Sequence, residues 1–270
     1  MAEINAKDVM KLRNSTGLPM MDCKTALAEA NGNAELAEDI LRKKLKGKME
    51  KRAERAAGEG CIAIAVRGDT AAIVERRAET DFTAKNERFS GGAAKIAAMA
   101  LDAPSDGPVL PTPAMTAIVD DLRISTGENC SLPRARVVKN PGGVFGHYVH
   151  HDGKTGVLVV GRGATNPEQL KQVGMHVTAA SPVPMGVTPN DIPPGVVERE
   201  RKFRVEQAIE SGKPKEIAEK MVEGGMKKFF AEIALLEQPF IMDQTKTVKE
   251  ILGSGVTIVG FHRWAVGEEA

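Results

Sequence analysis

Four of the five histidines in the chain gather in one region, and histidine is a common metal ligand and proton carrier near neutral pH. His147, His150 and His151 fall on one expected strand, and His176 falls on the helix expected after it. Because side chains alternate along a strand, His147 and His151 share one face and His150 points to the other. No cysteine or carboxylate pattern beside them has a metal-ligand spacing. We therefore expect no metal site, and a histidine-dependent metalloenzyme remains an alternative.

Other sequence motifs that could support catalysis are incomplete, because each lacks a feature that the motif requires. Gly153, Lys154 and Thr155 resemble the end of a phosphate-binding loop, but Tyr148 stands where that loop needs its first glycine. The segment also reads as a hairpin turn and not as a strand that enters a helix. No nucleophile-elbow motif accompanies the serine, histidine and aspartate residues. We therefore expect no catalytic residues, no cofactor and no enzyme chemistry.

A carboxylate and a large aromatic side chain stand together where an expected strand meets an expected helix. The apolar run from Ile73 ends in alternating charge and stops at residues 80–83, and a helical pattern with Phe89 on its apolar side follows. We expect Asp81 to cap this helix and Phe82 to lie in its first turn. Either Phe82 folds under the helix as a hydrophobic staple, which the pattern alone favours, or it is a probe that enters another protein.

The elements that would position this corner recur later in the chain. Residues 59–100 are predicted to form two strands, joined by a Gly-Asp turn at 68–69, and then a helix. Residues 143–180 repeat this plan around an Asp-Gly turn at 152–153. Such turns between apolar runs are strong hairpin signals. The sequence therefore predicts an α+β fold with two similar subdomains, each packing helices on one face of a small antiparallel sheet.

Helical segments flank the two subdomains. Residues 1 to about 46 read as three short helices, with Gly17 ending the first. Residues 43–55 are rich in lysine and arginine, so they form either a solvated helix or linker or, in a non-catalytic RNA- or ribosome-associated protein, an RNA contact. Beyond residue 193, two charged helical stretches predict an antiparallel hairpin. An apolar segment over residues 256–266 is expected to return to the second sheet.

For two sets of apolar residues in the helical segments, the sequence leaves two alternatives: packing inside the fold or contact with a partner. Met20 and Met21 are adjacent, so they cannot both point into one core stripe; core packing is favoured, but one of them is a candidate contact residue. Six apolar side chains of the expected hairpin form either its seam or a docking face: Phe203, Val205, Ile209, Ile217, Met221 and Val222.

Composition narrows the class of protein. The chain has 270 residues, of which 42% are hydrophobic, so it can bury one or two cores. No apolar run approaches the roughly 18 residues of a membrane helix, no signal peptide is evident, and three distant cysteines suggest neither disulfides nor zinc. We therefore expect a cytoplasmic protein without membrane contact. A net charge of +1 and an aromatic content of 4% lead us to expect no direct nucleic-acid binding.

Several motifs together resemble one known family. They are residues 79–89, which read ETDFTAKNERF, and residues 16–24, 175–180, 211–214, 219–224 and 238–240. On these motifs, which span nearly the whole chain, the sequence resembles elongation factor Ts, the protein that releases GDP from elongation factor Tu. The resemblance implies a translation elongation factor that binds elongation factor Tu carrying GDP or no nucleotide. It also implies that GDP is exchanged for GTP because the Mg²⁺ and phosphate site of the partner is disturbed.

The resemblance also implies a division of the chain and a set of contact residues. A ubiquitin-associated-like module and basic linker would occupy residues 1–53, and two core subdomains residues 54–140 and 141–270. The hairpin, an insertion at about 190–230, would allow a homodimer, as it does in some members of the family. The residues implied to probe the Mg²⁺ site are Thr80, Asp81, Phe82 and Thr83. The residues implied to bind the partner elsewhere are Leu12, Met20, Met21, Tyr148 and His150.

The sequence departs from the family pattern at three places. Thr83 stands where valine is usual, which keeps the shape but adds a hydroxyl group. An extra residue lengthens the turn after Tyr148, so either His150 or His151 fills the family position. Inside the helix after the corner, Gly91 and Gly92 each cost up to about 1 kcal/mol relative to alanine, so this helix is expected to start late or bend there.

Overall fold

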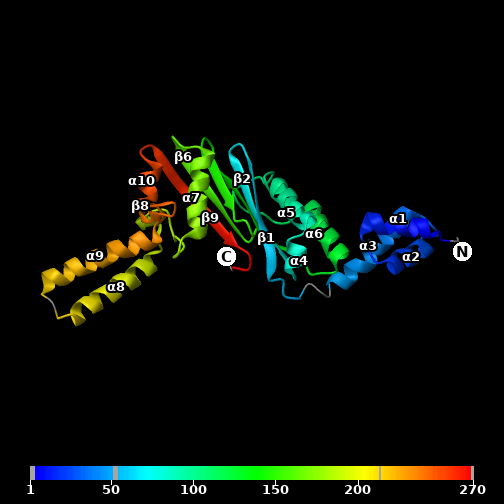
Figure 1. Cartoon of the computed structure of the whole chain (residues 1–270), viewed down its shortest axis with the longest axis horizontal. Coiled ribbons are helices and arrows are strands. Elements are labelled where there is room, and N and C mark those ends of the chain that lie inside the picture. The colour runs from blue at the N-terminus through cyan, green and yellow to red at the C-terminus, as the bar shows by residue number, and fades with distance from the viewer. Residues whose placement is uncertain (1–3, 51–53, 213, 269–270) are drawn as a thin grey trace. The chain divides into compact units, whose positions relative to one another are not determined.

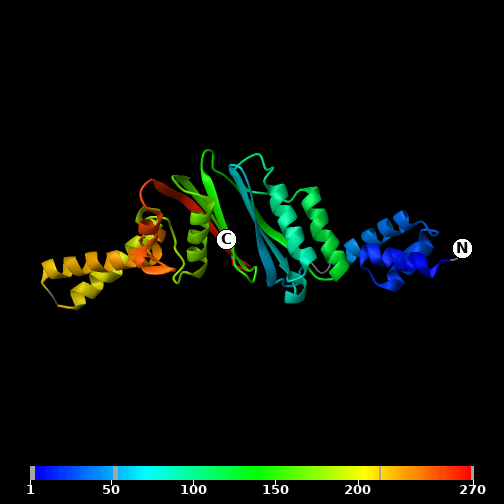
Figure 2. The same ribbon diagram turned by 45° about the horizontal axis from the view of Figure 1, so that its top comes forward.

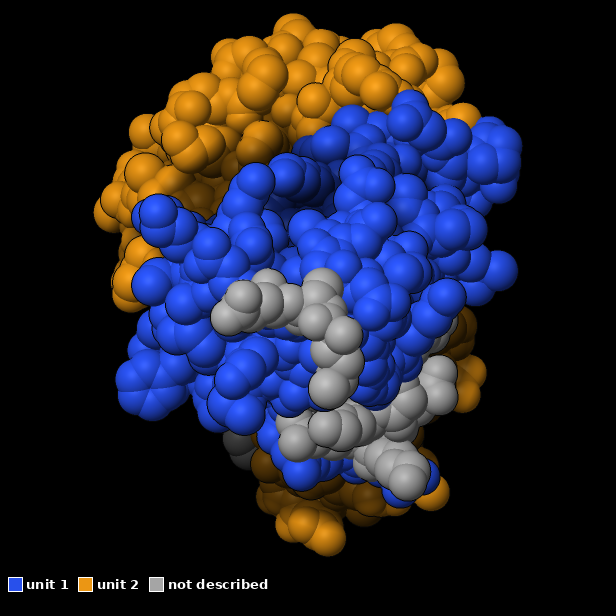
Figure 3. Space-filling view, turned by 90° about the vertical axis from the view of Figure 1, so that its right-hand side faces the viewer, with its two compact units in different colours: residues 1–65, 72–138, 265–270 blue, residues 66–71, 139–264 orange. Residues whose placement is uncertain are grey.

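The chain folds into two compact units that each combine helices with small sheets. The computed structural model describes residues 4–50, 54–212 and 214–268, and for residues 45–50 it describes the backbone alone. Unit 1 consists of Met1–Ala65, Ala72–Val138 and Ala265–Ala270, and unit 2 of Val66–Ala71 and Lys139–Trp264 (Figure 3). The predicted α+β class is confirmed. Among the described residues, no helix has both the length and the apolar character needed to cross a bilayer.

Three helices form the N-terminal module of unit 1, as predicted. They are α1 Ala6–Thr16, α2 Met20–Glu29 and α3 Ala34–Glu50 (Figure 1). Gly17 ends α1 with a φ of 74°, a left-handed conformation that glycine adopts without strain. The third helix continues past its predicted end near residue 46. The interpretation of residues 43–55 as an RNA contact or a linker falls largely on side chains outside the described part of the chain.

A four-stranded sheet in the order β1-β2-β4-β3 forms the centre of unit 1. Its strands are β1 Glu59–Arg67, β2 Thr70–Ala78, β3 Gly107–Pro108 and β4 Ser131–Lys139, and the helices that follow its strands are α4 Asp81–Ala84, α5 Glu87–Ala100 and α6 Pro113–Thr126. Helices α5 and α6 lie side by side on one face of this sheet (Figure 2). Val74, Phe89, Ile96 and Met115 share one apolar core there. The predicted order of strand, corner and helix is confirmed.

Helix α5 passes through both glycines that were expected to disturb it. It begins at Glu87, ahead of Gly91 and Gly92, and runs to Ala100. The predicted late start is wrong because Asn86 caps the helix, its side-chain oxygen accepting a hydrogen bond of 2.8 Å from the backbone of Arg88.

A three-stranded sheet in the order β5-β6-β9 forms the centre of unit 2. Its elements are β5 Val144–Val149, β6 Thr155–Gly163, α7 Pro167–Ala179 and β9 Val256–Ala265. Helix α7 approaches β5 so closely that a Cβ atom added to Gly146 would lie 2.3 Å from the Cβ of Leu170. Each of the two sheets therefore contains a hairpin that is followed by a helix, and the C-terminal segment joins the second sheet. The predicted duplication is confirmed.

Helices α8 Pro194–Glu210 and α9 Lys215–Ile233 form the predicted antiparallel hairpin (Figure 1). The remaining elements of unit 2 are short: η1 Pro189–Asp191, η2 Leu235–Glu237, β7 Pro239–Phe240, β8 Asp243–Thr247 and α10 Val248–Leu252. The apolar residues expected at the hairpin seam are not buried. Phe203, Val205, Ile209 and Ile217 are exposed, and Met221 and Val222 are half-buried. The seam interpretation is therefore wrong for the four exposed residues.

Candidate functional site

The corner between β2 and α5 is built by Thr80 and not by Asp81. Thr80 has an extended backbone, and its hydroxyl accepts a hydrogen bond of 3.3 Å from the backbone N–H of Thr83, which makes it the N-cap of α4. Asp81 is the first residue of this four-residue helix, so the prediction that Asp81 caps it is wrong. The expected single helix is in fact two, because the chain turns again at Asn86 before α5 starts.

Phe82 projects from this corner into solvent. Its side chain is 84% exposed, whereas the neighbouring Thr83 is only 7% exposed and Ala84 is also buried. The hydrophobic-staple interpretation is therefore wrong, and the corner presents an aromatic ring with no cover from its own chain. Asp81 lies beside it and is half-exposed. Of the four residues expected to act as a probe, the structure thus presents Asp81 and Phe82 and uses Thr80 and Thr83 within the fold.

Asp81 carries a negative charge at neutral pH. Its carboxylate accepts a hydrogen bond of 2.8 Å from the Nζ atom of Lys85, one turn further along. This hydrogen bond, together with the positive charge of Lys85, lowers the pKa of the Asp81 carboxyl below its ordinary value. The corner therefore offers an ionised carboxylate next to an exposed ring.

A loop after α6 holds the start of the corner in place. Glu128 accepts two hydrogen bonds from Thr80, one from its backbone N–H at 3.1 Å and one from its hydroxyl at 2.6 Å. The backbone N–H of Asn129 donates to the carboxylate of Glu79 at 2.7 Å. Sequence reasoning missed Glu128 and Asn129 because they lie about 50 residues away along the chain, and no local pattern signals such a pairing.

The residues of the N-terminal module expected to bind a partner fall into two groups. Leu12 is 3% exposed and belongs to the core of the module, so its side chain does not reach the surface. Met20 and Met21 lie in the first turn of α2 and are 44% and 68% exposed. Core packing, which the sequence favoured for them, is therefore wrong for both methionines. Methionine is flexible and polarisable, and it suits a contact surface that must adapt to a partner.

The third group of expected contact residues lies where β5 ends. The hydroxyl of Tyr148 and Nδ1 of His150 are 3.3 Å apart, within hydrogen-bond distance, and the rings of His150 and His151 meet edge to face at 4.2 Å between centroids. Since β5 ends at Val149, His151 belongs to the turn and does not continue the alternation of the strand. Among the described residues, no group of histidine, cysteine, aspartate and glutamate side chains is arranged to hold a metal ion.

His176 lies in the core of unit 2, and both nitrogen atoms of its ring make hydrogen bonds. Its Nδ1 atom accepts from the backbone N–H of Ile241 at 3.1 Å, so the proton sits on Nε2, which donates to the side chain of Gln238 at 2.9 Å. The amide of Gln238 in turn donates to the carbonyls of Pro182 and Glu232. Burial lowers the pKa of His176, because a charged imidazolium would lose its solvation, and the hydrogen bond to Gln238 opposes this shift only in part.

The stability of the protein is expected to fall in mild acid because of His176. Its pKa is lower in the folded than in the unfolded chain, so the unfolded chain takes up the proton first as the pH falls. The stabilising contribution is complete above the unfolded value of about 6.5 and is lost as the pH falls toward the folded value.

Urea unfolding measured at about pH 7.5 and about pH 5.5, on either side of the unfolded value, checks this prediction. The loss of unfolding free energy between the two pH values should be smaller in His176→Gln than in the unaltered chain. An equal loss in both would contradict the assignment.

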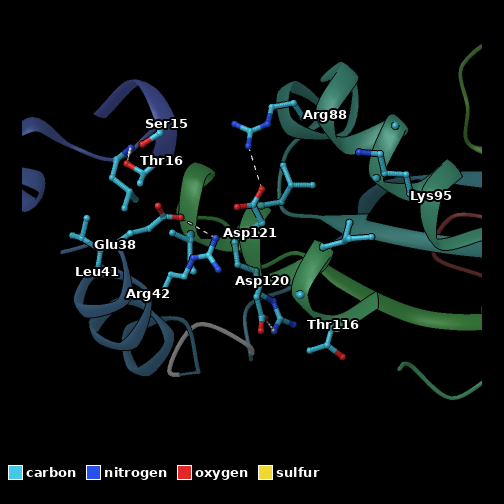
Figure 4. Close-up of a pocket in the computed structure, with 18 of the residues that line it drawn as sticks. Ser15, Thr16, Glu38, Leu41, Arg42, Arg88, Lys95, Thr116, Asp120 and Asp121 are labelled. Carbon is cyan, nitrogen blue, oxygen red and sulfur yellow. Dashed lines mark hydrogen bonds and ion pairs between the residues drawn. The ribbon is translucent and has the colours of Figure 1, made fainter. Parts of the chain in front are cut away.

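A cavity of about 830 Å³ lies in unit 1 between the N-terminal module and helices α5 and α6 (Figure 4). The ion pairs at its wall include Arg88 with Asp121 at 3.1 Å, Arg42 with Glu38 at 3.0 Å and Arg123 with Asp120 at 3.2 Å. Charges paired in this way satisfy each other and do not indicate a substrate. We therefore take the exposed corner, and not this cavity, as the candidate functional site.

The fold combines a helical module with α+β units, and its corner leaves the ring of Phe82 uncovered beside Asp81. Comparison with known proteins gives the family. The family model described as Elongation factor TS matches residues 79–268. The chain is 40% identical to elongation factor Ts of Maricaulis maris, 41% to that of Caulobacter vibrioides and 44% to that of Pasteurella multocida, in each case over 99% of this chain and 93% or 94% of the relative.

The chain therefore belongs to the elongation factor Ts family of translation elongation factors, which act as nucleotide exchange factors for elongation factor Tu. The family match begins at residue 79, so it contains the whole corner and the Tyr148–His150 pair. The N-terminal methionines lie outside this match but within the similarity to the relatives, which covers nearly the whole chain.

Proposed function

We propose that this chain releases GDP from elongation factor Tu by inserting Phe82 into the nucleotide domain of the partner, with Asp81 disturbing the Mg²⁺ and phosphate contacts that hold GDP. The observation that carries the proposal is the exposure of Phe82, 84%, beside an ionised carboxylate on an anchored corner. Single exposed apolar side chains are common on protein surfaces, so it is the combination of the ring, the carboxylate and the anchored corner that supports the proposal. No bond is made or broken in this mechanism, and it needs no cofactor.

For a large change in nucleotide affinity, we expect surfaces other than the corner to contribute. Burying one phenylalanine side chain contributes roughly 1.5–3 kcal/mol. A change of about 10⁴ in nucleotide affinity needs about 5.5 kcal/mol of differential binding. The N-terminal methionines Met20 and Met21, and Tyr148 with His150 in unit 2, are the exposed or partly exposed groups that supply further contact in this proposal.

The proposal assigns separate roles along the chain. Residues 1–53 dock on the partner, residues 54–140 carry the probe, and residues 141–270 add a second contact. The hairpin at about 190–230 supports a homodimer, since Phe203, Ile209 and Ile217 leave apolar surface on it uncovered. The chain acts in the cytoplasm, where translation takes place, without direct contact to nucleic acid.

Asp81→Asn should reduce GDP release while leaving the fold unchanged. The amide keeps the shape of the carboxylate but removes the charge that opposes the phosphate contacts of GDP. Asp81 is half-exposed and its ion pair with Lys85 lies at the surface, so the thermal midpoint should change little. Lys85→Ala is the matched control, because it removes the same ion pair and keeps the charge of Asp81. Slower release in Lys85→Ala than in Asp81→Asn would contradict this role.

Thermodynamic reciprocity tests the proposed function as a whole. If binding of the chain lowers the affinity of elongation factor Tu for GDP by some factor, binding of GDP must lower the affinity of elongation factor Tu for the chain by the same factor. Titration calorimetry should therefore show tighter binding to nucleotide-free elongation factor Tu than to its GDP complex, by the factor measured for GDP. Equal affinity for the two forms would overturn the proposal.

A further inference from the structure

A fully buried arginine lies directly beneath the corner. Arg76 is on β2, two residues before the strand ends, and its exposed fraction is 0%. On the same face of β2, the alternating neighbours Val74 and Ala78 belong to the apolar core formed with α5 and α6. A charged side chain is therefore buried where the strand pattern calls for an apolar one.

The guanidinium of Arg76 makes directed contacts with the first turn of α5. Its Nη1 atom donates to the carbonyl of Phe89 at 3.0 Å, and its Cζ atom lies 4.5 Å from the centre of the Phe89 ring. The two residues stand on either side of the corner, which spans residues 79–86. The contact therefore joins the strand that enters the corner to the helix that leaves it.

Burial of this arginine is unfavourable by itself. Nε and Nη2 have no hydrogen-bond partner in the described structure, and burial lowers the pKa of Arg76 despite the nearby thiols of Cys61 and Cys130. An apolar side chain of similar volume at such a position is usually no less stable. The guanidinium instead constrains the geometry, because it donates one hydrogen bond to one carbonyl and stacks on one ring.

Gly92 makes the space that this arrangement needs. A Cβ atom added to Gly92 would lie 2.4 Å from Nη1 of Arg76 and 3.2 Å from Ile118. Gly91, the preceding residue of the same helix, has no atom within 4 Å of such a Cβ. Glycine is unfavourable inside a helix, and at Gly92 the reason for it is the guanidinium underneath.

We propose that Arg76 is a positioning residue for exchange: by fixing the first turn of α5 to the end of β2, it sets the direction in which Phe82 projects. The inference rests on the proposed function of the corner. The Thr80–Glu128 hydrogen bonds fix the outer side of the corner, and the Arg76–Phe89 contact fixes its inner side.

The first test is Arg76→Met, which keeps the length of the side chain but removes its donors and charge. The rate of fluorescent GDP release is measured as a function of the concentration of folded chain, which separates the maximal rate from the half-saturating concentration. Loss of one charge-assisted hydrogen bond should lower the maximal rate by about tenfold without changing half-saturation. In a Phe82→Ala background the same substitution should have no further effect, because Arg76 acts through Phe82.

Gly92→Ala displaces the guanidinium without altering Arg76 and gives an independent test. It should lower the maximal rate as Arg76→Met does, whereas Gly91→Ala, the matched control in open space, should not. In an Arg76→Met background, Gly92→Ala should lose most of its effect, because the contact with Nη1 is gone and only the looser contact with Ile118 remains.

The outcomes separate this inference from the function on which it rests. If Arg76→Met and Gly92→Ala release GDP at the wild-type rate while Phe82→Ala is impaired, the positioning role of Arg76 is wrong and the role of the corner stands. Unimpaired release by Phe82→Ala overturns the role of the corner itself. If Arg76→Met does not fold, the comparison of Gly92→Ala with Gly91→Ala tests the positioning role. If Gly92→Ala does not fold either, Arg76 serves stability and the inference is contradicted.

Discussion

Phe82→Ala is expected to lower the maximal rate of GDP release from elongation factor Tu by roughly 10- to 100-fold. This range corresponds to the roughly 1.5–3 kcal/mol that a phenylalanine ring contributes when it is buried in a partner. Because Phe82 is 84% exposed in its own chain, its removal leaves no cavity, and the free energy of unfolding should be unchanged. Stopped-flow fluorescence and urea unfolding measure the two quantities on the same preparation.

A matched control separates the corner from exposed apolar surface in general. Leu110 is 85% exposed and lies in unit 1 outside the corner. Leu110→Ala should release GDP at the unaltered rate. Phe82→Leu, which keeps an apolar side chain but loses the ring, should fall between Phe82→Ala and the unaltered chain. Equal losses in Phe82→Ala and Leu110→Ala would show that exposed area, and not the corner, is being measured.

Glu75→Ala is expected to lower the free energy of unfolding by about 3–5 kcal/mol. The carboxylate of Glu75 is completely buried and accepts hydrogen bonds from Nε of Arg77 at 2.6 Å, from Nε of Arg134 at 2.5 Å and from the backbone of Gly267 at 3.0 Å. Its removal takes the carboxylate away from two guanidinium groups that are mostly shielded from water, although Arg134 still donates to the carbonyl of Ala265. Urea unfolding measures the loss, and Glu75→Gln should lose less because its amide oxygen still accepts.

An exposed ion pair provides the control for Glu75. Lys202 and Glu206 stand 4.0 Å apart on α8, with side chains 80% and 59% exposed. Glu206→Ala should change the free energy of unfolding by no more than about 1 kcal/mol. A change of that size in Glu75→Ala would contradict the view that the buried carboxylate holds β2, β4 and the C-terminal segment of unit 1 together.

The elements of this fold were predictable where local residues determine them. Gly68 and Gly153 adopt positive φ in the two hairpin turns, and Gly17 does so at the end of α1, as their places in the sequence indicated. Asn166 caps α7 through a hydrogen bond that its side chain accepts from the backbone of Gln169. These signals act over a few residues, so the sequence shows them directly.

The contacts that shape the corner were not predictable, because each depends on residues distant in the sequence. Phe82 matched the pattern of a packed staple, and only the tertiary structure leaves it uncovered. Thr80 and Asp81 are both good caps, and the choice follows from the hydrogen bonds of Thr80 to Glu128. Gly92 was expected to weaken its helix, whereas its role becomes clear only when Arg76 is placed beneath it.

The most direct test of the central proposal is the release of a fluorescent GDP from elongation factor Tu, followed by stopped flow with the intact chain and with Asp81→Ala and Phe82→Ala. We expect the intact chain to accelerate release and both variants, with folding preserved, to accelerate it much less. Absence of acceleration by the intact chain would contradict the proposed function, and full activity of both variants would contradict the assignment of the corner.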